Sequence, residues 1–156
     1  MHIDISIADQ TLTLTTDEGS LCWPVSTAVN GPGEQEGSGC TPRGRHVIRA
    51  RIGDGAPLGA VFVGRRPTGE IWSADQAAAS PERDWILTRI LWLSGCEPGF
   101  NRLGRVDSMR RFIYIHGTPD TEPMGVPRSH GCVRMRNTDI VALFERVPVG
   151  CPVHIG

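Results

Sequence analysis

Hydrophobic and polar residues alternate at the start of the chain. Ile3, Ile5 and Ile7 are separated by single polar residues, and Leu12 and Leu14 repeat the alternation after a short polar turn. Successive side chains of a β-strand point to opposite faces, so a period of two is typical of a strand with one buried face. The pattern therefore predicts an N-terminal β-hairpin.

Short strands separated by turns are predicted for much of the remaining chain. The segment 85–93 is rich in β-branched and aromatic residues, which favours a strand and leaves a buried helix as the alternative. Pro24 places the candidate strand 21–28 at a sheet edge or a bulge. The segment 30–44, with five glycines and two prolines, is predicted to be a loop. The other candidate strands are 46–52, 61–64, 112–116 and 151–155.

One helix is expected near the C-terminus. Its apolar residues recur at intervals of three and four positions, which is the spacing of one helix face. Asn137 is the predicted N-cap residue, and Pro148 and Gly150 end the helix. The apolar positions are Ile140, Val141, Leu143, Phe144 and Val147. One helix among many strands predicts a mostly-β fold with a minor α component.

The composition narrows the possible function classes. A chain of 156 residues with 39% hydrophobic and 21% charged residues is typical of one globular domain, here residues 1–156. No apolar run approaches the ~20 residues of a membrane-spanning helix. A net charge of −1 gives no electrostatic reason to expect nucleic acid or an anionic membrane as a partner. All 16 basic residues are arginines, which excludes Schiff-base lysines, Ser-Lys dyads and the P-loop lysine.

The cysteines and the first residues bear on the compartment. Five cysteines at irregular spacing, with no CxxC pair, indicate reduced thiols rather than a disulfide framework. The first residues lack the basic segment and apolar stretch of a signal peptide. We therefore expect a cytoplasmic protein, with the periplasm or cell envelope as the alternative if a leader has been removed or export is non-classical. The cysteines are Cys22, Cys40, Cys96, Cys132 and Cys151.

His116 and Cys132 are the candidate pair for nucleophilic catalysis. A cysteine nucleophile needs a base, hydrogen-bond donors for the oxyanion and access for substrate. His116 ends a predicted strand, Gly131 lets backbone amides approach a bound carbonyl, and the intervening loop is long enough to bring the two side chains within ~3–4 Å. His130 is a weaker candidate for the base. The same three His and Cys side chains could hold zinc, but no fourth ligand or general-base Glu is recognisable.

These residues closely resemble the L,D-transpeptidase (YkuD) catalytic domain family. The family motif is a His, a loop, and then Ser/Thr-His-Gly-Cys with Arg or Asn two positions further on. Residues 114–118 (Tyr-Ile-His-Gly-Thr) and 127–135 (Pro-Arg-Ser-His-Gly-Cys-Val-Arg-Met) match it. His46 departs from the family, which usually carries an aromatic residue there. Further similar segments are 25–28, 41–44, 91–95 and 150–155, so the resemblance spans nearly the whole chain.

The resemblance implies a fold and a reaction. The fold is a β-sandwich with one main helix after the Ser-His-Gly-Cys loop. Cys132 would attack the bond between the L-centre of the third residue of a peptidoglycan stem peptide and the terminal D-Ala. His116 would be the base, oriented by the Gly117 carbonyl. The resulting thioester would pass its acyl group to water (L,D-carboxypeptidase, murein recycling) or to an amine (cross-linking), and carbapenems would inactivate the enzyme.

The resemblance also implies a substrate-binding set. The backbone amides of residues 130–132 would form the oxyanion hole, and His130 would shape the pocket. Arg134 is the candidate partner of a substrate carboxylate, because its planar guanidinium can bind both oxygens. Ser129 would orient the loop, and Tyr114 belongs to the same set. The partner is a stem peptide or muropeptide, no metal or organic cofactor is needed, and the oligomeric state is left open.

Other interpretations remain at this point. An exported or effector L,D-transpeptidase would use the same chemistry on cell-wall peptides. A non-catalytic peptidoglycan-binding module is the alternative from a different class, and the intact His116 and Cys132 argue against it. The prolines and the glycine of residues 119–128 suggest a lid over the site. The pairs Arg65-Arg66 and Arg110-Arg111 are interpreted as solvated surface rather than as a binding patch.

Overall fold

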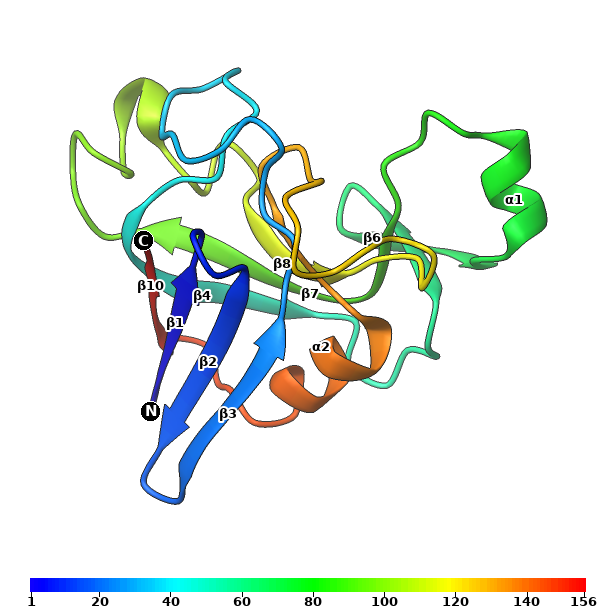
Figure 1. The fold of residues 1–156 in the computed structure, drawn as a ribbon, viewed down its shortest axis with the longest axis horizontal. Helices are drawn as coiled ribbons and strands as arrows, with labels where there is room; N and C mark the ends of the chain where they lie inside the picture. The colour runs from blue at the N-terminus through cyan, green and yellow to red at the C-terminus, as the bar shows by residue number, and fades with distance from the viewer.

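The computed structural model describes residues 1–156 as a mixed sheet of ten strands with two α-helices and one short 3₁₀ turn (Figure 1). The strand order is β3-β2-β1-β10-β4-β7-β5-β6, with β8 beside β7 and β9 beside β8. The strands are β1 (His2–Ser6), β2 (Thr11–Thr16), β3 (Gly19–Pro24), β4 (Gly44–Ile52), β5 (Ala60–Val63), β6 (Arg66–Ile71), β7 (Ile86–Gly95), β8 (Tyr114–Gly117), β9 (Val133–Met135) and β10 (Pro152–Ile155); the helices are α1 (Ala74–Ala79) and α2 (Asn137–Phe144).

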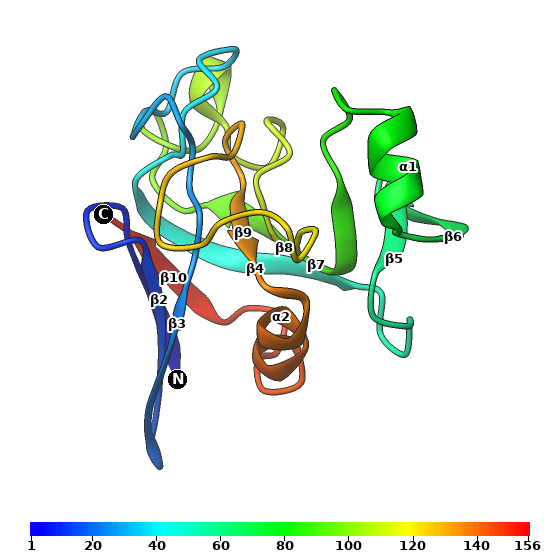
Figure 2. The same ribbon diagram turned by 45° about the vertical axis from the view of Figure 1, so that its right-hand side comes forward.

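The two ends of the chain meet in the sheet. β1 and β10 pair in parallel, with Ile3 opposite Val153, and the two strands lie side by side in Figures 1 and 2. β8 and β9 form the other parallel pair, and the remaining neighbours are antiparallel. The predicted N-terminal hairpin is confirmed, since β1 pairs antiparallel with β2. No helix has the length and apolar character needed to span a bilayer.

A core of 19 buried residues lies between the N-terminal strands and the layer formed by β8, β9 and α2. Ile3, Ile5, Leu12 and Leu14 supply the core side of the hairpin and are at most 2% exposed. Burial of each such side chain contributes about 1.5–3 kcal/mol. Ile115 in β8 faces them from the other layer. The mostly-β, sandwich-like prediction with one main helix after the Ser-His-Gly-Cys loop is confirmed, and both layers belong to one hydrogen-bonded sheet.

Several predicted boundaries were wrong. The third strand ends at Pro24 rather than at residue 28, and β8 begins at Tyr114 because Phe112 has a positive φ of 57°. The segment 85–93 is a strand, so the buried-helix alternative is wrong. Two strands and one α-helix were not predicted. β6 is exposed throughout, β9 has only three residues, and α1 buries no side chain and depends on a capping box between Ser73 and Gln76.

The N-cap prediction for α2 was also wrong. Arg136 occupies the N-cap position without a side-chain cap, and Asn137 is the first helical residue. The Asn137 side chain is 8% exposed and turns inward to Thr88 and Asp120. The side-chain amide of Asn137 therefore makes tertiary hydrogen bonds instead of capping the helix.

We expect Ile115→Ala to lower the free energy of unfolding by about 2–5 kcal/mol, because the side chain is 0% exposed and its loss leaves a cavity. Ile71→Ala is the matched control, since Ile71 is 49% exposed, and should cost less than about 1 kcal/mol. Urea unfolding of both variants measures the difference. Equal losses would contradict the assignment of Ile115 to the core.

His46 makes stability depend on pH. It is 1% exposed; its Nδ1–H donates to the Gly44 carbonyl, and its Nε2 accepts from the Ser108 hydroxyl at 2.8 Å. Burial lowers the pKa of His46 from 6.5 to about 4. Between pH 6.5 and about 4, His46 is therefore protonated in the unfolded chain but neutral in the folded chain. The stabilisation is therefore present above pH 6.5 and is lost as the pH falls towards 4.

As the pH is lowered, we expect the free energy of unfolding of His46→Phe to fall less steeply than that of the wild type. The wild-type decline attributable to His46 is at most roughly 3 kcal/mol over this window. Denaturant unfolding at about pH 7.5 and about pH 5 gives the two slopes. The variant also loses the Ser108 contact, but that loss does not depend on pH. Parallel pH profiles for wild type and variant would exclude His46 as the titrating group.

Candidate active site

β8 and β9 bring His116 and Cys132 to one side of the sheet. The two strands are parallel, with His116 opposite Arg134. Tyr114 therefore lies beside Cys132, the residue just before β9, and the four side chains share one face because alternate residues of a strand do so. Ile115 points to the opposite face, where it belongs to the core. The sequence-predicted base and nucleophile thus lie on the same face of the β8–β9 pair.

The Cys132 sulfur is held by two backbone groups. The Tyr114 N–H donates to Sγ at 3.3 Å, and the thiol donates to the Phe112 carbonyl at 3.3 Å. Burial raises the pKa of the Cys132 thiol to about 12, although the Tyr114 N–H and the Arg134 charge act in the opposite direction. The sulfur is therefore a neutral thiol near pH 7, and it needs a base to become a nucleophile.

His116 is oriented as such a base. It is 1% exposed, and its Nδ1 lies 2.6 Å from the Gly117 carbonyl oxygen. A carbonyl can only accept a hydrogen bond, so Nδ1 carries the proton and Nε2 carries the free lone pair. Burial lowers the pKa of His116, against the opposing effects of the Gly117 carbonyl and the Asp84 charge. The imidazole is therefore neutral near pH 7 and able to accept a proton.

Gly117 lies where there is no room for a side chain. A Cβ at this position would lie 2.5 Å from Asn137 Oδ1 and 2.6 Å from the Leu87 carbonyl oxygen. Thr88, which has a positive φ of 73° at a bulge in β7, donates its hydroxyl to the same Asn137 oxygen. Asn137 Nδ2 donates to Asp120 at 3.2 Å. The inward-facing Asn137 therefore ties α2 to Thr88 in β7, the strand that pairs with the one carrying the orienting carbonyl.

The Ser-His-Gly-Cys loop is fixed by hydroxyl groups. Ser129 donates to the Cys132 carbonyl and accepts from the Gly131 N–H at 3.2 Å, while Thr41 donates to the Gly131 carbonyl at 2.9 Å. Gly131 has a φ of 133°, which favours glycine. The Gly131 N–H is thus engaged, whereas the N–H groups of His130 and Cys132 donate to no other group of the chain. These two remain available to a bound oxyanion.

Asp84 is the acidic residue of the site, and no motif in the sequence indicated it. Its carboxylate pairs with Arg134 at 2.9 Å and with His130 at 3.4 Å. Burial alone would raise the pKa of Asp84, but the charges of His116, Arg134 and His130 lower it. Arg134 is buried and also donates to the Arg128 carbonyl. Its guanidinium is therefore already occupied by Asp84 rather than open to the pocket.

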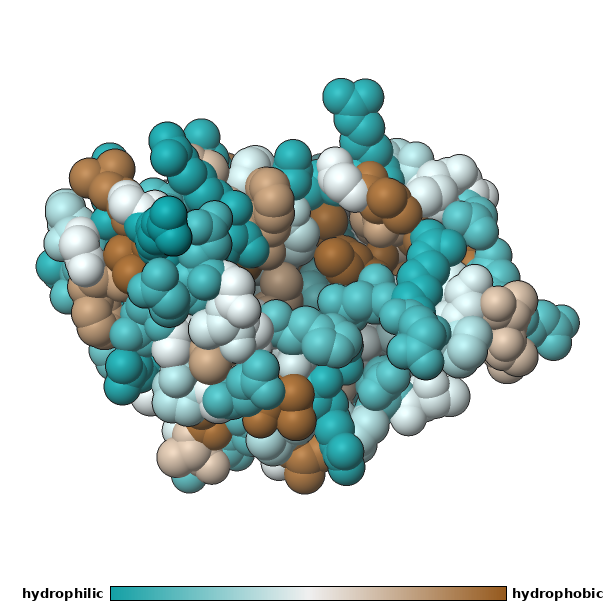
Figure 3. Space-filling model, turned by 90° about the horizontal axis from the view of Figure 1, so that it is seen from above, coloured by the Kyte–Doolittle hydropathy of each residue, from teal (hydrophilic) through white to brown (hydrophobic).

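Cys132 lies in the wall of a pocket of about 550 Å³. Neither His116 nor Arg134 lines it, but Arg65 and Arg111 do, one residue from each of the two arginine pairs. Figure 3 shows a hollowed face on which hydrophobic residues are bordered by hydrophilic ones. The pocket lining comprises Phe62, Gly64, Arg65, Asp84, Ile86, Ile90, Arg111, Phe112, Ile113, Tyr114, His130 and Cys132.

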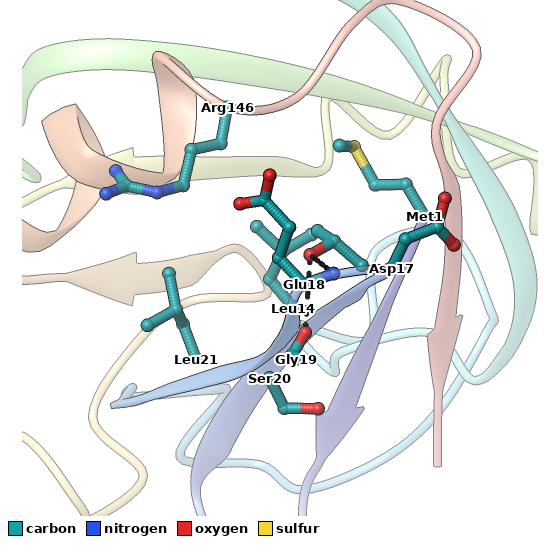
Figure 4. Close-up of a pocket in the computed structure, with 9 residues that line it drawn as sticks. Met1, Leu14, Asp17, Glu18, Gly19, Ser20, Leu21 and Arg146 are labelled. Carbon is teal, nitrogen blue, oxygen red and sulfur yellow. Dashed lines mark hydrogen bonds between the residues drawn. The ribbon is translucent and has the colours of Figure 1, made fainter.

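The rest of the chain holds no second candidate centre for this chemistry. A second pocket lies at the turn between β2 and β3, where Leu14, Glu18 and Arg146 border it (Figure 4), and no histidine or cysteine lines it. No three or more His, Cys, Asp or Glu side chains gather in a metal-binding arrangement. The segment 119–128 is hydrogen-bonded to residues 25–27, for example through the Gly125 N–H and the Val25 carbonyl at 2.9 Å.

Known proteins with related sequences and structures are L,D-transpeptidases. "Probable L,D-transpeptidase YbiS" of Escherichia coli strain K12 is 56% identical over 44 residues, which is 28% of this chain and 14% of that protein. L,D-transpeptidase 3 from Mycobacterium tuberculosis with a faropenem-derived adduct has a TM-score of 0.59 at 17% identity, covering 98% of this chain and 58% of that one. LD transpeptidase LdtMt1 in complex with imipenem has a TM-score of 0.56 at 17% identity, covering 99% and 57%.

The chain thus spans less than two thirds of the length of these relatives, and the structural likeness establishes the shared fold. The family model of the L,D-transpeptidase catalytic domain (YkuD) matches residues 1–155. That match includes His116 in β8 and Cys132 just before β9. The chain therefore belongs to the L,D-transpeptidase catalytic domain family.

Proposed function

We propose that this chain is a cysteine acyltransferase that cleaves the bond between the L-centre of the third residue of a peptidoglycan stem tetrapeptide and the terminal D-Ala. The observation that carries the proposal is the placement of a pocket-lining thiol, Cys132, and a neutral imidazole, His116, whose Nδ1–H is held by Gly117, on one face of the β8–β9 pair. Family membership supports the substrate class.

In the first step, Sγ of Cys132 attacks the carbonyl carbon while its proton passes to Nε2 of His116. The N–H groups of His130 and Cys132 stabilise the oxyanion. The carbon–nitrogen bond then breaks, and the imidazolium returns the proton to the leaving amine of D-Ala. The carbonyl of Gly117 and the carboxylate of Asp84 stabilise the imidazolium while it exists. The product is a thioester on Cys132.

We propose water as the preferred acceptor of the acyl group, which makes the reaction an L,D-carboxypeptidase step on recycled tetrapeptides in the cytoplasm. All five cysteines are free thiols, which supports a reducing compartment. The second candidate is transfer to an amine, which cross-links stem peptides. The names of the relatives, all L,D-transpeptidases, favour this second candidate. The two reactions share the thioester and differ only in what resolves it.

Product analysis separates the two acceptors. Purified tetrapeptide muropeptide incubated in ¹⁸O-labelled water should yield tripeptide and free D-Ala, with the label in the new tripeptide carboxylate. Mass spectrometry detects all three. A predominance of cross-linked dimer would reverse the preference for water. Recovery of unchanged tetrapeptide under all conditions would refute the substrate class.

Replacement of the sulfur tests the nucleophile. We expect Cys132→Ala to abolish turnover and the mass increase that a carbapenem produces in the wild-type chain, because no thioester can form. Cys22→Ala removes an exposed thiol and should leave both intact, whereas Cys151→Ala, which alters a buried residue, should cost only stability. Intact-mass spectrometry and thermal melting provide the readouts. Turnover that survives in Cys132→Ala would remove Cys132 from the nucleophile role, and would favour a mechanism without a covalent intermediate.

A further inference from the structure

Arg65 is a rigidly held cation in the wall of the pocket that contains Cys132. It follows β5 in the tight turn to β6 and has a positive φ of 64°. Its guanidinium stacks 4.4 Å from the ring centre of Trp92 and 5.1 Å from that of Phe112. One amino group donates to the Tyr114 hydroxyl at 2.9 Å. Contacts with three aromatic side chains therefore fix its orientation.

This guanidinium has no acidic partner. No Asp or Glu carboxylate lies within ion-pair distance of Arg65. The other arginine of the lining, Arg111, donates to the carbonyls of Gly33, Glu34 and Cys40. An arginine has five N–H donors, and Arg65 commits one of them to Tyr114, so its remaining donors are available to a ligand.

Tyr114 connects this cation to the sulfur. Its backbone N–H contacts Cys132 Sγ at 3.3 Å, and its hydroxyl contacts Arg65 at 2.9 Å. The cation thus lies about the length of one tyrosine from the nucleophile. Because Arg65 and Cys132 line the same pocket, a peptide whose scissile bond meets the sulfur can also bring a nearby carboxylate to the guanidinium.

We propose that Arg65 binds a carboxylate of the acyl donor and so makes the enzyme select donors that carry a free acid next to the scissile bond. The inference rests on the proposed function, because it assumes a peptide donor. Two carboxylates meet the description: the terminal one on the leaving D-Ala, and one carried by the side chain of the third residue. Both offer the planar pair of oxygens that a guanidinium recognises.

The experiment measures binding in the Cys132→Ala chain, where no turnover occurs. Isothermal titration uses three tetrapeptides: the free acid, the terminal carboxamide, and the carboxamide at the third-residue side chain. Arg65→Gln in this background should weaken binding of the free acid by roughly 10- to 100-fold. Arg66→Gln, at the exposed neighbouring position, is the matched control and should change none of the three affinities.

In the chain that keeps Arg65, one of the two carboxamides should bind as weakly as the free acid binds to Arg65→Gln. That carboxamide identifies the carboxylate that Arg65 contacts. Arg65→Lys should retain part of the preference for the free acid, because it keeps the charge but loses the planar pair of donors. Arg65→Gln that weakens all three peptides equally would show a merely structural role and would overturn the proposal, as would an unchanged preference or no binding of any peptide.

The outcome is distinguishable from failure of the proposed function. Turnover of tetrapeptide by the wild-type chain, with no acid preference lost in Arg65→Gln, would reject only the role of Arg65. An acid preference that depends on Arg65, without turnover by the wild-type chain, would reject only the proposed reaction.

Discussion

Strands β8 and β9 run parallel, with Ile115 opposite Val133 and His116 opposite Arg134. Ile115 and Val133 are fully buried in the main core. Because successive side chains alternate between faces, burial of these two obliges His116 to point to the other side. A slip of one residue would exchange the faces and place the imidazole in the apolar core. The hydrophobic effect therefore specifies the position of the base as well as the stability of the fold.

The charge states of the site follow from its burial. Low access to water raises the pKa of the Cys132 thiol to about 12 and lowers the pKa of the His116 imidazole, so both groups rest in neutral forms. A thiolate–imidazolium pair is therefore not formed in advance, and in the proposed reaction charge develops only as the sulfur attacks. Asp84 then faces the new imidazolium, and Arg134 keeps that carboxylate ionised. The site thus places fixed charges where charge would appear in the proposed reaction.

The sequence predicted those parts of the molecule whose signal is local. Alternation over a few residues identified the hairpin, helical periodicity identified α2, and the motif resemblance indicated the contact between His116 and Gly117 that the structure shows. Asp84 and Arg65 could not be found in this way. Each acts through a partner about 50 residues away, Arg134 for Asp84 and Tyr114 for Arg65, and no local pattern encodes such a pairing.

Asn137 shows a different limit of sequence reasoning. Asparagine is a favoured N-cap, and its position before an apolar periodic segment justified that prediction. The local preference yielded because Thr88 and Asp120 offer the same side chain hydrogen bonds across the fold. A residue that satisfies buried partners stabilises more than an exposed cap, since an unpaired buried polar group costs about 1–3 kcal/mol. Such competition between a local helix cap and a tertiary contact can be recognised only when the pairing of the strands is known.

Partial burial of the unpaired Arg65 guanidinium has an energetic cost. A half-buried cation without a carboxylate loses hydration, and stacking on Trp92 and Phe112 offsets only part of that loss, about 0.5–1 kcal/mol for each exposed contact. Arg134 solves the same problem with Asp84. Arg65 is instead anchored to Tyr114, whose backbone touches the sulfur. Tyr114 and His116 belong to the same strand, β8. The register of β8 against β9 therefore positions the proposed base relative to the sulfur and, through Tyr114, also the guanidinium of Arg65.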